Sequence, residues 1–203
     1  MILQPIIEGG KVTRRCCWST LALALAVPLT ALGAEETYVF DPVHSQPLCE
    51  VAHMGFSVQR VSFTKITGRV TLDRTAHRGS LDATVDTDSL RSYSEKLDAH
   101  LRGEDFFNVA KYPTMTFKSS DLVFDGDKLV AANGELTLLG VTKPVTFKVA
   151  NFVCGEQPFN KRPMCGAEAT ATIMRSEWGM KYGIPKAASD EVRISLPIEA
   201  FRQ

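Results

Sequence analysis

Apolar and polar residues alternate with a period of two along most of this chain. In KITGRVTLD (65–73), Ile66 and Val70 share one face and Arg69 lies on the other, and VTFKV and VRISLPIEA repeat the pattern. Because successive side chains of a β-strand point to opposite sides, the pattern predicts strands with one apolar face. Turn-like segments such as RTAHRG and LGVTKP separate them, so we expect an antiparallel all-β domain.

Small residues occupy several inward positions of these expected strands. Ala167, Ala169 and Ala171 share one inner face, and Gly68 lies on that of another strand. Small inner residues let two sheets pack closely in a sandwich, or they leave space inside a barrel, where about eight strands can enclose one small ligand. The pattern leaves both architectures open. The outer faces carry Lys, Arg, Glu and Thr, so we expect them to face water rather than lipid.

One segment interrupts the strands. In YSEKLDAHLRG, Ser94 is a suitable N-cap, an apolar residue recurs every four positions from Tyr93, and Gly103 is a suitable stop. Phe106 and Phe107 follow directly. We expect a short helix that covers one end of a barrel, with phenylalanines that either point into a cavity or only seal a core.

Residues 1–33 have the layout of a secretory signal peptide. The basic residues Lys11, Arg14 and Arg15 precede the apolar run WSTLALALAVPLTAL, and ALGA offers small residues for cleavage. The apolar run is short for a membrane-spanning helix. We therefore expect a cleaved leader followed by one domain over residues 34–203.

Charge is balanced, with 23 Lys and Arg against 23 Asp and Glu in the whole chain. Residues 1–33 hold three of the basic and one of the acidic residues, which leaves 20 against 22, a net charge of about −2. Such a domain has no general attraction for nucleic acid or for an anionic membrane. We expect no nucleic-acid partner.

Two cysteines flank a loop-like stretch, GEQPFNKRPM. In an oxidising compartment, Cys154 and Cys165 are good candidates for a disulfide. A metal site is disfavoured because no second Cys or His pair stands at ligand spacing. Cys49 would remain unpaired. If its face is inward, its thiol lines the interior as a small apolar group.

The segment LDAHLRGEDFFNVAKYPTMTFKS closely resembles the D-x-H-L, FF, YP and F-S signature of the YceI-like family of bacterial secreted proteins. The segments YVFDPVHS, HMGFS, GELTLLGVTKPVTFKV and MRSEWGM are similar to other elements of that family, and together they cover residues 38 to about 200. The resemblance implies an extended antiparallel lipocalin-like β-barrel of about eight strands, with a short helix and loop at one end. It therefore favours the barrel over the sandwich.

The resemblance also implies a function. Such proteins are generally periplasmic, are often associated with stress responses, and hold a long isoprenoid amphiphile, such as a polyprenyl phosphate or an isoprenoid quinone, in an apolar tunnel. The bound lipid would be the ligand, and we expect no catalytic cofactor. A homodimer and a transient contact with the membrane or with a membrane redox protein remain open.

In such a tunnel, apolar burial supplies affinity and a few polar groups at the mouth give specificity. The candidate lining residues are Phe56, Phe106, Phe107, Phe117, Leu138, Phe147, Met174 and Trp178. The candidate polar groups are His44, Asp98, His100 and Arg175. For Asp98 and His100, an anchoring role between helix and barrel is the first interpretation, and ligand contact is the second.

Signatures of known catalytic sites are missing from the sequence, which has no G-x-S-x-G elbow, H-E-x-x-H pair or phosphate loop. Asp41, His44 and Ser45 are close in DPVHS, but neighbours along one short segment rarely reach triad geometry. A hydrogen-bond cluster that ties the first strand is favoured. We expect a binding protein and not an enzyme. The alternatives are an accessory partner of a membrane redox protein and an enzyme that acts on an amphiphile inside the barrel.

Overall fold

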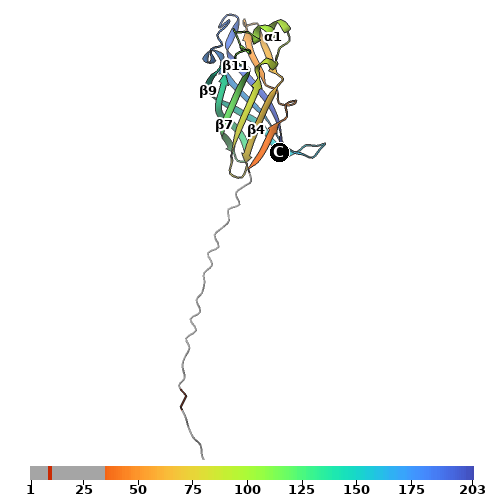
Figure 1. The fold of residues 1–203 in the computed structure, drawn as a ribbon, viewed down its shortest axis with the longest axis vertical. Coiled ribbons are helices and arrows are strands. Elements are labelled where there is room, and N and C mark those ends of the chain that lie inside the picture. The colour runs from red at the N-terminus through yellow and green to blue at the C-terminus, as the bar shows by residue number, and fades with distance from the viewer. Residues whose placement is uncertain (1–8, 11–34) are drawn as a thin grey trace, which may run out of the picture. The chain divides into compact units, whose positions relative to one another are not determined.

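Eight antiparallel strands close into a ring in the computed structural model, which describes residues 9–10 and 35–203 (Figure 1). The ring is closed because β1 pairs with β11 as well as with β4. The predicted barrel is confirmed, and the sandwich is wrong. The strands of the ring are β1 (Glu36–Phe40), β4 (Ile66–Asp73), β5 (Arg78–Asp86), β7 (Thr114–Asp125), β8 (Lys128–Leu138), β9 (Val141–Glu156), β10 (Pro163–Met174) and β11 (Ala188–Arg202).

Three further strands extend the wall at one end of the barrel. They are β2 (Leu48–His53), β3 (Ser57–Phe63) and β6 (Leu90–Arg91). The long strand β11 serves two neighbours, because its first half pairs with β2 and its last residues pair with β1. There are two short 3-10 helices: η1 (Thr87–Ser89) leads directly into β6, which contacts α1, and η2 (Arg175–Trp178) follows β10 and contacts β11.

The alternation of the sequence matches the two sides of the wall. In β4, Ile66 and Leu72 are buried while Thr67 and Arg69 are exposed. The same phase holds in β10, where alternate residues from Ala169 to Ile173 are buried. The inward faces meet in the interior, and the charged faces point to water, as predicted.

One α-helix is present in the described part of the chain, α1 (Glu95–Arg102), and it covers one end of the barrel (Figure 1). The Oγ of Ser94 accepts a hydrogen bond from the backbone N–H of Leu97 at 3.4 Å, and Gly103 is the C-cap, as predicted. Tyr93 does not share the helical face, since it precedes the cap and is 94% exposed. That part of the expectation is wrong.

Side chains of α1 tie it to the barrel. The buried carboxylate of Asp98 accepts a hydrogen bond from the backbone N–H of Ser92 at 2.7 Å. Burial alone would raise the pKa of Asp98, but hydrogen bonding from Ser92, aided by the nearby Arg102 and Arg91, lowers this pKa below its ordinary value. Arg102 also donates to the carbonyl of Leu90 in β6. Asp98 therefore fixes the segment that leads into the helix, while Arg102 makes the link to β6; an anchoring role of Asp98 between helix and barrel stays a prediction.

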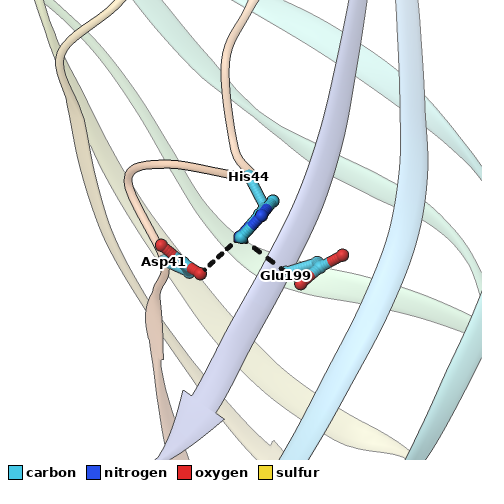
Figure 2. Close-up of side chains that lie close together, drawn as sticks. All are labelled: Asp41, His44 and Glu199. Carbon is cyan, nitrogen blue, oxygen red and sulfur yellow. Dashed lines mark hydrogen bonds and ion pairs between the residues drawn. The ribbon is translucent and has the colours of Figure 1, made fainter. Parts of the chain in front are cut away.

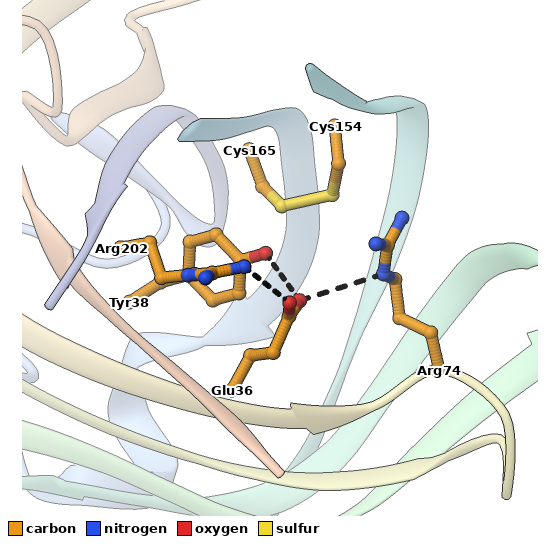
Figure 3. Close-up of a disulfide and its surroundings, with 6 residues drawn as sticks. All are labelled: Glu36, Tyr38, Arg74, Cys154, Cys165 and Arg202. Atoms are coloured by element: carbon orange, nitrogen blue, oxygen red, sulfur yellow. Dashed lines mark hydrogen bonds and ion pairs between the residues drawn. A yellow bond between two sulfur atoms is a disulfide. The ribbon is translucent and has the colours of Figure 1, made fainter. Parts of the chain in front are cut away.

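The predicted disulfide is confirmed at the opposite end. Cys154 and Cys165 face each other across the β9–β10 pair. Beside them, the Glu36 carboxylate accepts from Tyr38 at 2.7 Å and from Arg202 at 2.6 Å (Figure 3). Burial, together with Glu36, raises the pKa of Tyr38 to about 12. The disulfide staples the base of a hairpin, drawn in cyan, that projects from the barrel near the C-terminus (Figure 1).

The predicted signal peptide, residues 1–33, lies outside the described residues apart from positions 9–10. The domain boundary at residue 34 therefore stays a prediction. Within the described part of the chain, no helix combines the length and the apolar character needed to cross a bilayer.

Candidate functional site

The interior of the barrel contains two apolar cavities. The larger one, of about 290 Å³, lies at the helix end, and the smaller one, of about 90 Å³, lies toward the disulfide. Four residues line both cavities, namely Ala83, Phe117, Phe147 and Leu196. Most of the residues that line the two cavities are apolar, so the interior suits an apolar ligand.

The helix and the aromatic pair form a lid on the larger cavity. Leu97 and Leu101 of α1 face inward, and Phe107 packs edge-on against the fully buried ring of Phe63, with ring centroids 5.4 Å apart. The ring of Phe106 contacts Tyr182 at a centroid distance of 5.4 Å. Both phenylalanines line the cavity, so they close one end of it rather than only sealing a core.

An aromatic pair borders both cavities. The rings of Phe117 and Phe147 meet edge to face, with centroids 4.8 Å apart. Gly134 makes room for one of them, because a Cβ at Gly134 would lie 2.6 Å from Cζ of Phe117. The ring can therefore lie close against β8. We call Phe117 and Phe147 the partition.

A buried guanidinium is the one arginine in the wall of the larger cavity. Arg175 is 2% exposed. It donates to the backbone carbonyls of Ser189 at 2.9 Å, Met180 at 3.1 Å, Tyr182 at 2.9 Å and Ala188 at 3.5 Å. Burial lowers the pKa of Arg175, and the negative charge of nearby Asp190 opposes part of this shift because it favours the charged guanidinium. In the described residues it has no carboxylate at ion-pair distance.

Cys49 faces the larger cavity from β2. The residue is half-buried, because its side chain borders the empty space of the cavity. The thiol is nevertheless surrounded by protein, and this burial raises the pKa of Cys49 to about 12. The thiol is therefore protonated and apolar in character at neutral pH. Val51, two residues on, faces the cavity as well.

Seven of the candidate residues lie in the wall of the larger cavity. They are Phe106, Phe107, Phe117, Leu138, Phe147, His100 and Arg175. The contact of these residues with a ligand stays a prediction.

Three candidate lining residues lie elsewhere, and their expected placement is wrong. Phe56 is 92% exposed in the turn between β2 and β3. Met174 points outward, because the inward phase of β10 belongs to Ile173. Trp178 is buried but lines neither cavity, and its Nε1 donates to the carbonyl of Leu136 at 3.2 Å.

Two of the candidate polar groups also lie away from the larger cavity. Asp98 fixes the segment that leads into α1, as described above. His44 is largely exposed, and Figure 2 shows its ring between the carboxylates of Asp41 and Glu199. Its Nδ1 lies 2.7 Å from Asp41 Oδ2 and 3.9 Å from Glu199 Oε2. Hydrogen bonding to Asp41 raises the pKa of His44, and the same bond lowers the pKa of Asp41.

The neighbouring serine does not complete a catalytic triad. Ser45 is fully buried, and its Oγ donates to the carbonyl of Glu199 at 3.1 Å and accepts from the N–H of Glu199 at 3.0 Å. The hydroxyl is thus engaged by β11 rather than by His44. Asp41, His44 and Glu199 form the one group in the described ranges whose possible metal-ligand atoms all lie within 4.8 Å. An ion pair accounts for this geometry.

The sequence pattern did not reveal the cavity wall formed by residues 182–188. Tyr182, Gly183, Ala187 and Ala188 line the larger cavity, but most of this segment is a loop without a two-residue period. Tyr182 also contacts His100, with ring centroids 5.1 Å apart. The loop therefore joins the lid, and only tertiary contacts place it there.

The sequence pattern of the YceI-like domain matches residues 38–200. The chain belongs to the YceI-like family. Its relatives include a UPF0312 protein of Pseudomonas aeruginosa strain LESB58, 32% identical over 91% of this chain and 97% of the relative. A UPF0312 protein of Shewanella sp. strain W3-18-1 is 30% identical over 90% of this chain and 95% of the relative.

Solved structures share the YceI-like fold. BcnA of Burkholderia cenocepacia superposes with a TM-score of 0.65 at 23% identity and covers 79% of this chain and 98% of its own. A polyisoprenoid-binding domain from Saccharophagus degradans gives a TM-score of 0.62 at 16% identity and covers 82% and 98% of the two chains. At these identities the likeness concerns the fold alone.

Proposed function

We propose that this YceI-like protein is a periplasmic carrier that holds a long isoprenoid amphiphile, a polyprenyl phosphate or an isoprenoid quinone, inside its barrel. The observation that carries this proposal is an apolar cavity closed by a helical lid, with one buried guanidinium in its wall. A solved structure of the same fold is described as a polyisoprenoid-binding domain, which supports the ligand class.

The geometry suggests how an amphiphile would lie. The polar side chains His100, Arg175 and Tyr182 line the helix end of the larger cavity, whereas the partition and the smaller cavity are apolar. Four hydrogen bonds occupy four of the five guanidinium hydrogens of Arg175. One hydrogen on Nη1 is left for the head group. The isoprenoid chain would point toward the partition.

Apolar burial can supply the affinity. If a chain hides about 500 Å² of apolar surface, the gross gain is about 12 kcal/mol at ~25 cal/mol/Å². The free-energy cost of ordering a flexible chain and of losing its free motion offsets several kcal/mol of this gain. Micromolar or tighter binding follows. The larger cavity alone is at the small end of the range of roughly 300–1,000 Å³ for ligand pockets, so a long chain needs both cavities.

The periplasmic location rests on two features. The disulfide between Cys154 and Cys165 suits an oxidising compartment, and residues 1–33 read as an export signal. A homodimer, a contact with a membrane redox protein and a role in stress response stay predictions.

The test is native mass spectrometry of protein purified from the periplasm, followed by solvent extraction and identification of the lipid. We expect one isoprenoid lipid per chain. A protein that is empty and that also fails to bind added polyprenyl phosphates and quinones would exclude the carrier. Turnover of an added amphiphile that is lost in His100→Gln would instead favour an enzyme.

A further inference from the structure

Exposed apolar side chains occur in two segments that also contribute residues to the wall of the larger cavity. The turn between β2 and β3 presents Phe56, 92% exposed, and Met54, 55% exposed, and Tyr182 is half exposed beside the lid. Large apolar groups gathered on a surface mark interaction sites more often than isolated ones do. Here they occur together with two exposed lysines. We define the mouth patch as Met54, Phe56, Val58, Lys181, Tyr182 and Lys186.

Hydrogen bonds hold the two halves of the mouth patch side by side. The N–H of Met54 donates to the carbonyl of Ala187 at 3.1 Å, and β2 pairs with β11 there through His53 and Ala188. The patch is therefore one surface, although its two segments are about 130 residues apart in the sequence.

The turn that presents the patch is a tight β-hairpin turn. Met54 has φ of 52° and Gly55 has φ of 76°, and the N–H of Phe56 donates to the carbonyl of His53 at 3.0 Å. Positive φ at both central residues is the geometry that best joins two twisted strands. The turn therefore holds Met54 and Phe56 at the end of the β2–β3 hairpin, where both side chains are exposed.

The mouth patch is continuous with the cavity wall. His53, Tyr182, Gly183 and Ala187 line the larger cavity, and they are next to or within the patch in sequence. Whatever rests on the patch thus lies beside residues that line the larger cavity.

The charge of the mouth patch selects its partner. The patch itself contains Lys181 and Lys186 and no Asp or Glu, while the acidic residues Glu50, Glu177 and Asp190 come just before or after its two segments. This contrasts with the rest of the exported domain, which is slightly acidic. Asp105 is on the α1 side of the mouth, 3.4 Å from His100. A surface that combines aromatic, apolar and lysine side chains is suited to the interface of an anionic bilayer, where the rings enter the head-group region and the ammonium groups stay near the phosphates.

We propose that the mouth patch docks the barrel on the anionic surface of a phospholipid bilayer, where the cavity takes up its lipid. The docking stands by itself, whereas the uptake rests on the proposed carrier function. Docking at this point would let an isoprenoid pass from bilayer to cavity without crossing water.

The experiment measures docking and cargo separately. Docking is measured by co-sedimentation of the purified protein with vesicles of phosphatidylethanolamine and phosphatidylglycerol that contain no isoprenoid, with phosphatidylcholine vesicles for comparison. The test variants are Met54→Asn with Phe56→Ser, and Lys181→Gln with Lys186→Gln. Asparagine tolerates positive φ, so the turn should persist. Circular dichroism and thermal unfolding check the fold of each variant.

The chain offers matched controls at the opposite end of the barrel. Phe159, at the tip of the β9–β10 hairpin, is also 92% exposed, so Phe159→Ser removes an equally exposed ring. Lys128→Gln with Lys161→Gln removes two exposed lysines of the same end. Both controls should bind vesicles as the wild type does.

We expect the wild type to bind the anionic vesicles. The apolar double variant should bind about tenfold more weakly, and the lysine double variant several-fold more weakly, with a smaller difference in high salt. No vesicle binding by the wild type, or equal losses in the Phe159→Ser control, would overturn the docking proposal and leave a protein partner as the occupant of the patch.

Cargo is tested with polyprenyl phosphate presented in detergent micelles. The apolar double variant should bind this cargo as the wild type does but extract it more slowly from vesicles. If the wild type docks on vesicles and binds no cargo, the carrier function fails while the docking stands. If both proteins extract cargo from vesicles at the same rate, uptake through the mouth patch is wrong.

Discussion

The two cavities belong to one interior, but different elements enclose them. Around the smaller cavity, strands of the closed ring place small residues such as Ala167 and Ala169 opposite aromatic rings. There Phe40 occupies the space above Gly68, where a Cβ would come within 2.4 Å of the ring. The larger cavity has a wall of β-branched and aliphatic residues, and a lid formed by α1 and the two phenylalanines after it.

The difference shows where empty volume comes from in this barrel. Small inward residues alone do not create the larger cavity, because rings from facing strands fill much of the space they leave, as close packing requires. Space persists where a short helix spans the barrel end without inserting side chains deeply enough to fill it. The partition marks the boundary between these two kinds of packing.

Removing a ring of the partition should have the largest effect. Phe117→Ala joins the two cavities, and the free energy of unfolding should fall by about 3–5 kcal/mol, since a buried ring is lost and a void is left. The bound isoprenoids should become longer. Urea unfolding and native mass spectrometry measure the two effects.

The control for the partition is Phe124→Ala in the same strand, because Phe124 is half-buried and lines neither cavity. It should leave the distribution of chain lengths unchanged. An unchanged distribution in Phe117→Ala as well would mean that the ring does not limit the ligand.

Filling each cavity in turn should sharpen the contrast. Val51→Phe places a larger side chain in the larger cavity and reduces its free volume, so it should weaken binding of a polyprenyl phosphate about tenfold or more. Ala169→Leu fills part of the smaller cavity, so it should exclude long isoprenoid chains while short isoprenoids still bind. Each change should lower the free energy of unfolding by about 1–3 kcal/mol through overpacking. Titration with isoprenoids of different length distinguishes the two, and identical length profiles would contradict distinct roles.

Removing the disulfide should lower the stability of the domain without changing the helix end of the barrel. Cys154→Ser with Cys165→Ser releases a short closed loop and should lower the free energy of unfolding by about 2–3 kcal/mol in the chain-entropy model. Binding of a short isoprenoid that fits the larger cavity should stay the same, because Cys165 lines only the smaller cavity. A parallel loss of lipid affinity in calorimetric titration would show that the two ends are coupled.

The smallest effect is expected at His44. Its raised pKa makes its stabilising contribution complete below about pH 6.5, and this contribution is lost as pH rises through the folded pKa. The lowered pKa of Asp41 makes its contribution complete above about pH 4, and this is lost as pH falls through the folded pKa.

The Asp41–His44 pair should therefore stabilise the protein most between about pH 4 and pH 6.5. In His44→Gln, we expect a fall in melting temperature of less than about 2 °C in this range and almost none at pH 9, since exposed pairs contribute little. Thermal unfolding across pH measures it. A larger fall at pH 9 than at pH 5 would contradict the assignment.

The alternation of residues was sufficient to predict the strands and their inward faces. It also contained the correct position of Met174, because Ile173 already occupies the inward phase of β10. The N-cap at Ser94 and the stop at Gly103 were readable because capping depends on neighbours in the chain. The paired phenylalanines after the helix were correctly expected at the barrel end.

Contacts between distant segments could not be read in this way. Trp178 looked like a lining residue, but its indole N–H donates to the carbonyl of Leu136, 42 positions away, and the ring lines neither cavity. Phe56 occupies a turn that directs it to water, and Tyr182 reaches the lid from a loop without periodicity. No local signal distinguishes these positions.

The sequence by itself determined the all-β class, the capped helix and the cysteine pair, because period, capping and a short closed loop are properties of neighbouring residues. The family signature added the choice of a barrel. Only the tertiary structure decided that the interior is divided by Phe117 and Phe147, that Arg175 is buried in its wall, and that the mouth patch is one surface. These features depend on how side chains from facing strands share the same space, which close packing resolves only when the ring is closed.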